Sequence, residues 1–152
     1  MNNDDIVDTL NDLIETSKDG EYGFRSSAEY LKAVDTRRLF EGRADECRRA
    51  AAELQTLVQQ YGGNPEDSGS ASAAMHRGWV AVKGTLAGYS DKAILEETER
   101  GEDVALESYR HALAEGLPAD VRSVVESQFE GVKRNHAQVR QLRDQARAAS
   151  ST

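Results

Sequence analysis

The sequence predicts an all-α protein, a four-helix bundle made of two antiparallel helical hairpins with a long connection between them. Three observations lead to this fold class. Apolar residues recur every three or four positions along four long stretches. The two prolines, Pro65 and Pro118, both lie at breaks between those stretches. No stretch shows the sustained polar–apolar alternation of a half-buried strand.

The first hairpin combines the first two long helices. The first helix is predicted to run from about Asp4 to Lys32, because apolar or small residues follow a three-to-four spacing over most of this stretch. Asp35 or Thr36 is expected to cap the second helix at its N-terminus. The segment GGNP should end that helix just after Tyr61, since glycine commonly follows the last helical residue.

The second hairpin follows a long polar connection, in which residues 71–86 predict a short extra helix. Asp91 is expected to cap the third long helix, which should end near Glu115. Pro118 suits the first turn of the last helix, and residues 148–152 are expected to form a frayed tail. A simple up-down-up-down bundle does not need such a long link. The long connection therefore predicts a crossover that makes the third long helix parallel to the second, which is the ferritin-like topology.

Length and composition narrow the classes of protein. A chain of 152 residues can bury one continuous core, so we expect a single domain over 1–152, ordered from about 3 to 147. No apolar run approaches the roughly 20 residues of a membrane helix, and we expect no membrane association. The start of the chain lacks the charged and apolar regions of a signal peptide, which favours a cytoplasmic protein.

Charge and cysteine usage exclude further classes. The net charge of −8 argues against sequence-independent nucleic-acid binding. Basic residues near the end of the last helix are interpreted as complementing the helix dipole; they are Arg134, Arg140, Arg143 and Arg147. One cysteine, Cys47, cannot form an internal disulfide or a multi-cysteine zinc site. It is interpreted as a small core residue, with a reactive thiol as the alternative.

A polar layer is expected across the middle of the bundle. Each residue turns a helix by about 100°, which places five mid-helix residues toward the apolar direction: Glu21, Arg43, Cys47, Glu102 and His136. By the same reasoning, Glu15 and Asp19 should point away from the core. Buried charges need partners. Two interpretations stay open: a closed network of ion pairs and hydrogen bonds, or a metal ion held by Glu21, Glu102 and His136 beside Arg43 and Cys47.

Several motifs resemble a known family. The stretches LNDLIETSKDGEYGFRSSAEYL, DECRRAAAELQTLVQQYGGNPEDSGS, MHRGWVAVK, ILEETERGEDVALESYRHAL and GVKRNHAQVRQLRD occur in order over residues 3–147. They are similar to the small bacterial ferritin-like four-helix-bundle family, described mainly as a domain of unknown function. The resemblance implies a ferritin-like fold. The wider superfamily includes rubrerythrins and other di-iron proteins, which use two single glutamates and two Glu-x-x-His motifs.

The chain departs from this di-iron signature. On the second helix, Cys47 and Ala50 stand at the spacing of Glu-x-x-His, and on the last helix His136 follows Lys133 instead of a glutamate. At most three of the six expected ligands remain. We therefore expect no cofactor, with a single iron, manganese or zinc ion at the reduced site as the alternative.

These observations favour a non-enzymatic ferritin-like helical-bundle protein with an accessory, stress-related role, the last element resting on the resemblance alone. No catalytic residues and no cofactor-binding motif stand out, so we lean toward a protein that is not an enzyme. We expect a homo-oligomer, most simply a dimer. A metal-binding or redox protein is the first alternative, and a module whose acidic outer faces bind a protein partner is the second.

Overall fold

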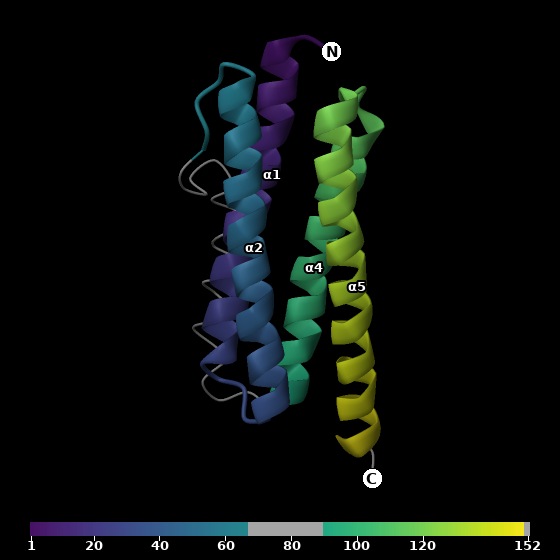
Figure 1. The fold of residues 1–152 in the computed structure, drawn as a ribbon. Helices are drawn as coiled ribbons and strands as arrows, with labels where there is room; N and C mark the ends of the chain where they lie inside the picture. The colour runs from purple at the N-terminus through teal and green to yellow at the C-terminus, as the bar shows by residue number, and fades with distance from the viewer. Residues whose placement is uncertain (67–89, 151–152) are drawn as a thin grey trace.

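Four long helices make up the part of the chain described in this computed structural model, residues 1–66 and 90–150. Figure 1 labels them α1 (Asn3–Ala28), α2 (Val34–Gln60), α4 (Asp91–Ala114) and α5 (Ala119–Ser150). No strand occurs among these residues. The predicted all-α four-helix bundle is confirmed, whereas the short extra helix expected at 71–86 lies outside the described residues.

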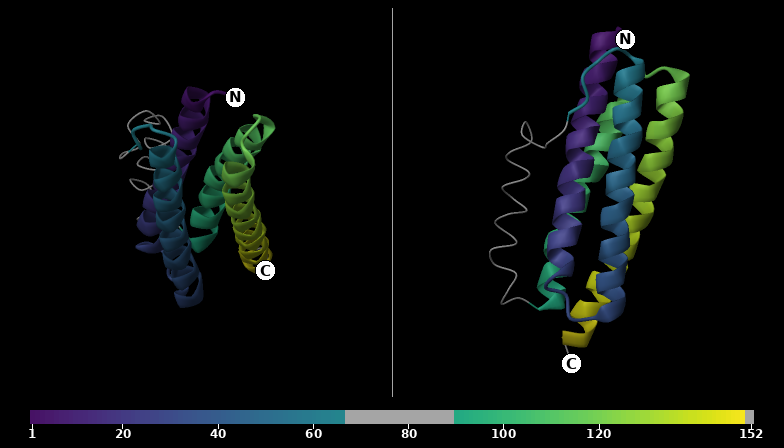
Figure 2. Two further views of the ribbon diagram at one scale, coloured as in Figure 1. Left: turned by 45° about the horizontal axis from the view of Figure 1, so that its top comes forward. Right: turned by 60° about the vertical axis from the view of Figure 1, so that its left-hand side comes forward.

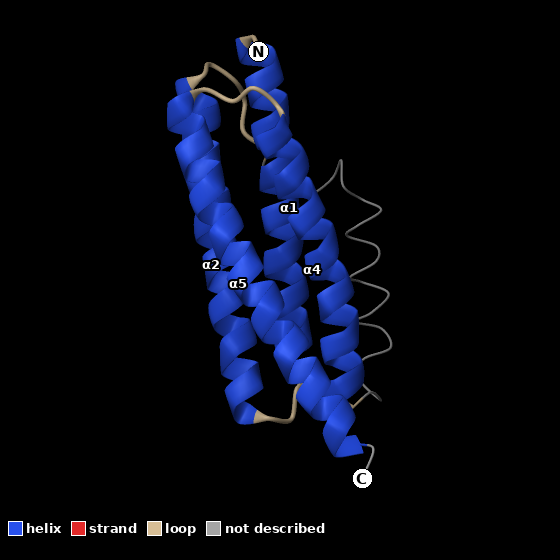
Figure 3. Ribbon diagram, turned by 90° about the vertical axis from the view of Figure 1, so that its right-hand side faces the viewer, coloured by secondary structure: helices blue, strands red, loops and turns tan. Residues whose placement is uncertain are grey.

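The helices pack as two antiparallel hairpins. α1 packs along α2, α4 packs along α5, and α1 also contacts α4, whereas α2 and α5 meet at few positions. In Figures 1 and 2, α2 and α4 run in one direction and α1 and α5 in the other. Figure 3 shows the same four rods from the side of α5. The parallel α2 and α4 are the arrangement that the long crossover predicted.

Asp91 joins the beginning of the second hairpin to the turn of the first. Its two carboxylate oxygens accept hydrogen bonds from the backbone N–H groups of Lys32 and Ala33, each at 2.9 Å. We expected Asp91 to cap its own helix, and this is wrong. Ser90 is the N-cap, and its hydroxyl accepts a hydrogen bond from the N–H of Ala93 at 3.3 Å. Both Asp91 oxygens face the neighbouring turn, so they do not serve α4 itself.

The turn between α1 and α2 also differs from the prediction. α1 ends at Ala28, before the predicted end at Lys32. α2 has no side-chain cap, and the expected caps Asp35 and Thr36 lie inside its first turn. The guanidinium of Arg37 instead donates two hydrogen bonds, at 2.7 and 3.2 Å, to a carbonyl of the preceding loop. The turn is thus held by side chains that reach back to it from α2 and across from α4.

α2 ends where the GGNP segment predicts. Tyr61 is the C-cap, and Gly62 has a φ of 78°, in the left-handed region that glycine adopts most easily. The N–H groups of Gly62 and Gly63 donate to the carbonyls of Gln59 and Val58, each at 3.0 Å. These bonds satisfy carbonyls that the end of the helix would otherwise leave without a partner.

α5 begins and ends close to its predicted limits. The carbonyl of Pro118 accepts a hydrogen bond from the N–H of Arg122 at 2.7 Å, which places the proline at the helix start as predicted. At the other end, the helix continues to Ser150, through the first residues of the expected frayed tail.

The buried apolar residues form two clusters, one toward each end of the bundle. The larger cluster includes Leu10, Leu13, Leu54, Val121 and Val125. The smaller cluster includes Phe24, Phe40, Cys47, Ile94 and Val139. Among the described helices, none combines the length and the apolar character that crossing a membrane requires. The region between the two clusters is polar, and we call it the waist of the bundle.

Candidate functional site

One polar layer of the waist, which we call the tyrosine layer, links all four helices through Ser17, Glu53, Tyr109 and Gln128. The Tyr109 hydroxyl donates to Oε1 of Gln128 at 2.8 Å and lies 3.4 Å from the Ser17 hydroxyl. The Gln128 amide nitrogen donates to Oε1 of Glu53 at 2.7 Å and to the Ala50 carbonyl at 3.3 Å. Burial raises the pKa of Tyr109 to about 12, so its hydroxyl stays neutral and available as a donor.

The second polar layer, the arginine layer, consists of Arg43, Glu102 and Asn135. Nε of Arg43 lies 3.8 Å from Oε1 of Glu102, and the Asn135 amide donates to that same carboxylate oxygen. Nη1 of Arg43 donates to Glu46 at 3.1 Å, and the guanidinium lies 5.8 Å from the ring centre of Phe24. A separation of 3.8 Å is an ion pair but too long for a hydrogen bond. Nε of Arg43 is therefore buried without a hydrogen-bond partner.

Burial controls the protonation of the groups at the waist. It raises the pKa of Glu102 above the ordinary value of 4.5, and the opposing effects of Arg43 and Asn135 do not cancel it. Burial also works against the charge of Arg43, but Cys47 and the carboxylates of Glu102 and Glu46 outweigh it, so its pKa is raised. The guanidinium is therefore a permanent cation inside the bundle.

Cys47 belongs to the core. Its side chain is buried, and burial raises the pKa of the thiol to about 12. The predicted core position is thereby confirmed, and a neutral thiol is a poor nucleophile. Gly20 on α1 gives this side chain its space, because a Cβ at Gly20 would lie only 3.0 Å from Sγ of Cys47.

A cavity of about 330 Å³ lies between the two polar layers. All four helices line it, and the residues at mid-height are small: Gly20, Cys47, Ala50, Ala105 and Gly131. Because these positions carry little volume, the helices cannot fill the space that they enclose. The exposed residues of the lining all belong to α2, namely Glu46, Arg49 and Glu53. The cavity therefore opens to solvent along the α2 side.

The structure places the five residues predicted for the polar layer in different surroundings. Arg43, Cys47 and Glu102 are buried and line the cavity together, as their angular positions predicted. Glu21 is partly exposed and lies 3.3 Å from the guanidinium of Arg25. His136 contacts Asp103 of α4 and does not line the cavity. The structure thus joins three of the five at the waist, while Glu21 pairs with Arg25 and His136 pairs with Asp103.

The expected orientation of two other acidic residues is wrong. Glu15 and Asp19 were expected to point away from the core, but both are buried, with Asp19 only 1 % exposed. Thr16, Ser17 and Ser26 of the same helix are buried as well. α1 therefore buries a polar face as well as its apolar face, and a single mean apolar direction cannot represent both.

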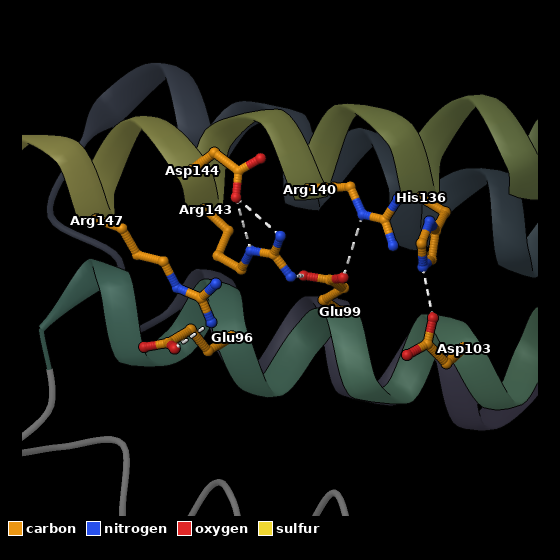
Figure 4. Close-up of polar contacts among 8 residues, drawn as sticks. All are labelled: Glu96, Glu99, Asp103, His136, Arg140, Arg143, Asp144 and Arg147. Carbon is orange, nitrogen blue, oxygen red and sulfur yellow. Dashed lines mark hydrogen bonds and ion pairs between the residues drawn. The ribbon is translucent and has the colours of Figure 1, made fainter.

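A row of ion pairs, which we call the α4–α5 ladder, closes the seam between those helices (Figure 4). Glu96 pairs with Arg147 at 2.7 Å, and Glu99 receives both Arg143 and, at 3.5 Å, Arg140. We interpreted these arginines as complementing a helix dipole. These arginines instead form ion pairs with carboxylates of α4, and Arg143 also pairs with Asp144 of α5. Antiparallel packing makes the pairs with α4 possible, because it places the C-terminal half of α5 beside the first half of α4.

His136 completes the ladder and is the residue around which metal ligands gather. Its Nε2 lies 2.6 Å from Oδ1 of Asp103. One ligand atom each from Glu99, Asp103 and His136 lies within 4.8 Å of the others. Glu99 and Asp103 are not among the residues predicted from the sequence. Their spacing of four on α4, matched by His136 and Arg140 on α5, is the signal that could have found them.

The two regions differ in how well their residues fit a metal ion. At the waist, the guanidinium of Arg43 lies beside Glu102 and repels a cation. In the ladder, carboxylate and imidazole are suitable ligands for iron, manganese or zinc. However, Arg143 and Arg140 already neutralise Glu99, and a metal would have to displace them.

Comparisons with known proteins agree with this architecture. The family described as "Domain of unknown function (DUF2383)" matches residues 5–115. Among solved structures, a bacterioferritin-related protein of Bacteroides fragilis, titled a dodecameric thioferritin, is similar with a TM-score of 0.78 and 16% identity over 99% of this chain and 92% of its own.

A mutant of Dps1 from Mycobacterium smegmatis is similar with a TM-score of 0.74 and 14% identity, over 93% of this chain and 96% of its own. Comparison with curated protein sequences gives no match. At these identities the solved structures establish the fold alone, and the fold is ferritin-like, as the motifs predicted. With the family matching most of its length, the chain belongs to the DUF2383 family of unknown function.

Proposed function

We propose that this protein is a non-enzymatic ferritin-like bundle in which a guanidinium–carboxylate layer takes the place of a metal centre at the waist. The observation that carries the proposal is the buried cation of Arg43, 3.8 Å from Glu102. Asn135 donates to the same carboxylate, which fixes its orientation. Such a layer holds α2, α4 and α5 in one register without a metal ion.

The role of such a bundle is accessory: it binds or assembles and performs no reaction of its own. The stress-related element of this role rests on the ferritin-like fold only. We also propose that the chain acts as a single cytoplasmic domain that self-associates, with a dimer as the smallest unit. The dodecameric assembly of the Bacteroides fragilis neighbour supports self-association. Light scattering coupled to size-exclusion chromatography measures the subunit number directly.

Metal analysis tests the proposal. Protein purified without a histidine tag is incubated with Fe²⁺, Mn²⁺ or Zn²⁺, desalted and analysed by mass spectrometry. We expect substoichiometric metal. The Glu102→Ala variant should lose about 1–4 kcal/mol of unfolding free energy whether or not metal is supplied, because it removes the buried one of the two carboxylates that face Arg43. Stoichiometric metal that disappears in this variant would overturn the proposal.

A metal-binding role is the second candidate, and the grouping of Glu99, Asp103 and His136 within 4.8 Å favours it. The ligand set of Glu21, Glu102 and His136 stays a prediction. The two sets are separable, because Glu99→Ala removes a ligand of the first and Glu102→Ala a ligand of the second. Glu107→Ala is the matched control, since Glu107 lies on the same helix with its side chain 77% exposed.

A further inference from the structure

We propose that the cavity between the tyrosine and arginine layers binds a small, uncharged molecule that carries a carbonyl group. Arg43 provides the first reason. It lines the cavity, its side chain is more than nine-tenths buried, and its Nε is the one buried side-chain nitrogen or oxygen without a hydrogen-bond partner among the described residues. Buried donors are almost always paired, so this N–H needs an acceptor. A carbonyl oxygen in the cavity would supply one.

The size and the walls of the cavity indicate the body of the ligand. A cavity of about 150 Å³ can hold benzene. The 330 Å³ at the waist therefore has room for an aromatic ring with substituents. Phe24, Ala105 and Val132 provide apolar surface for such a ring. An apolar cavity with a few directed polar groups is the usual form of a small-molecule site.

The charges of the lining indicate an uncharged ligand. Two arginines and three glutamates line the cavity: Arg43, Arg49, Glu46, Glu53 and Glu102. Arg43 already faces two of these carboxylates, Glu46 at 3.1 Å and Glu102 at 3.8 Å. A carboxylate ligand would bring a third negative charge to the same guanidinium, and a cationic ligand would be repelled by it. A neutral carbonyl accepts the hydrogen bond without either penalty.

Three probes of similar size separate these features. Benzamide has a ring and a neutral carbonyl, benzoate has the same ring with a charge, and toluene has the ring alone. Titrations of the full chain, followed by amide chemical shifts, give a dissociation constant for each. We expect benzamide to bind about tenfold or more tightly than toluene, since a hydrogen bond from a charged donor contributes that much. Benzoate should also bind more weakly than benzamide.

Variants locate the binding. Arg43→Lys keeps a cation but removes the Nε donor, so benzamide should bind no better than toluene. Ala50→Leu places extra volume in the lining and should weaken all three probes at least tenfold. Ala52→Leu is the matched control, because Ala52 is an exposed residue of the same helix and should leave binding unchanged.

The proposal is overturned if no probe binds, if benzoate binds most tightly, if the three bind equally, or if Ala50→Leu leaves benzamide binding intact. Should Arg43→Lys fail to fold, the Ala50→Leu and Ala52→Leu pair still decides the matter. Metal content does not enter this experiment. If no probe binds, the proposal of a metal-free waist is unaffected. If metal analysis finds a bound metal, the ligand proposal is still decided by the probe titrations.

Discussion

The Arg43–Glu102 pair at the waist and the Glu96–Arg147 pair of the α4–α5 ladder use the same chemical groups in different surroundings. At the waist, the side chains of Arg43 and Glu102 are 9% and 2% exposed, and the closest atoms stay 3.8 Å apart. In the ladder, Glu96 and Arg147 are 36% and 50% exposed and approach to 2.7 Å. The exposed pair thus makes the shorter contact.

This difference shows that burial and quality of contact are separate properties of an ion pair. Exposed side chains are free to adjust until they meet, and water continues to solvate them. The waist pair is held between packed helices beside a cavity, and its guanidinium keeps an unpaired N–H. The ion pairs of the ladder therefore form at close distance, whereas Nε–H of Arg43 at the waist still lacks a hydrogen-bond acceptor.

The largest expected difference between the two regions is in the cost of deleting an arginine. Arg43→Ala should lower the unfolding free energy by about 3 kcal/mol or more, because Glu102 is left buried without its cation. Arg147→Ala should cost less than about 1 kcal/mol, as is usual for an exposed pair. Urea denaturation monitored by circular dichroism measures both.

The double variant Arg43→Met with Glu102→Leu is the control for lost packing. It should recover most of the loss, because apolar side chains of similar volume often replace a buried pair at little cost. If Arg43→Ala and Arg147→Ala lower the unfolding free energy equally, the waist pair is solvated, and the expected difference between the two regions is contradicted.

The next expected difference is the sign of a pH dependence. The folded pKa of Glu102 is raised by burial, so its contribution to stability is fully present below about pH 4.5 and is lost as pH rises through the folded pKa. Arg147 lowers the pKa of Glu96, so that contribution is present above pH 4.5 and is lost as pH falls.

Denaturant titrations between pH 3 and pH 8 test this difference. Relative to the wild type, Glu102→Gln should gain stability as pH rises above about 4.5. Glu96→Gln should lose stability over the same range, by less than about 1 kcal/mol because the group is exposed. Parallel pH profiles for the two variants would contradict the assignment of opposite shifts.

The smallest expected difference concerns two glycines. Gly42→Ala should raise stability by up to about 1 kcal/mol, since an added Cβ meets nothing within 4 Å and alanine favours the helix. Gly20→Ala should gain less or lose stability, because its Cβ would approach Sγ of Cys47 to 3.0 Å. Thermal unfolding of both variants measures the contrast, and an equal gain would show that the waist accommodates the methyl group freely.

The sequence predicted the burial of Arg43, Cys47 and Glu102 because helical period is a local property of the backbone. It also predicted the end of α2, where the Gly62 conformation follows from residue type. The caps at Asp35, Thr36 and Asp91 failed for a different reason. Where a short polar side chain finds its partner depends on what lies across the turn, and that neighbour comes from another part of the chain.

The candidate site was only partly predictable on the same grounds. A mean apolar direction assigns one face to a helix, so it could not show that α1 also buries Glu15 and Asp19. The ladder depends on how far α4 is displaced along α5, and no pattern within either helix contains that displacement. The cavity required all four helices together, since each contributes only one or two of the small residues around it.

The contact between Asp91 and the backbone of Lys32 and Ala33 has a consequence for the whole molecule. It holds the first residue of α4 at the turn between α1 and α2, and so sets the position of one hairpin relative to the other along the bundle axis. A slip of one helical turn moves a side chain about 5.4 Å, enough to part Glu102 from Arg43. The carboxylate of Asp91, at one end of the bundle, thus determines which residues of α2 and α4 lie opposite each other about 16 Å further along the bundle.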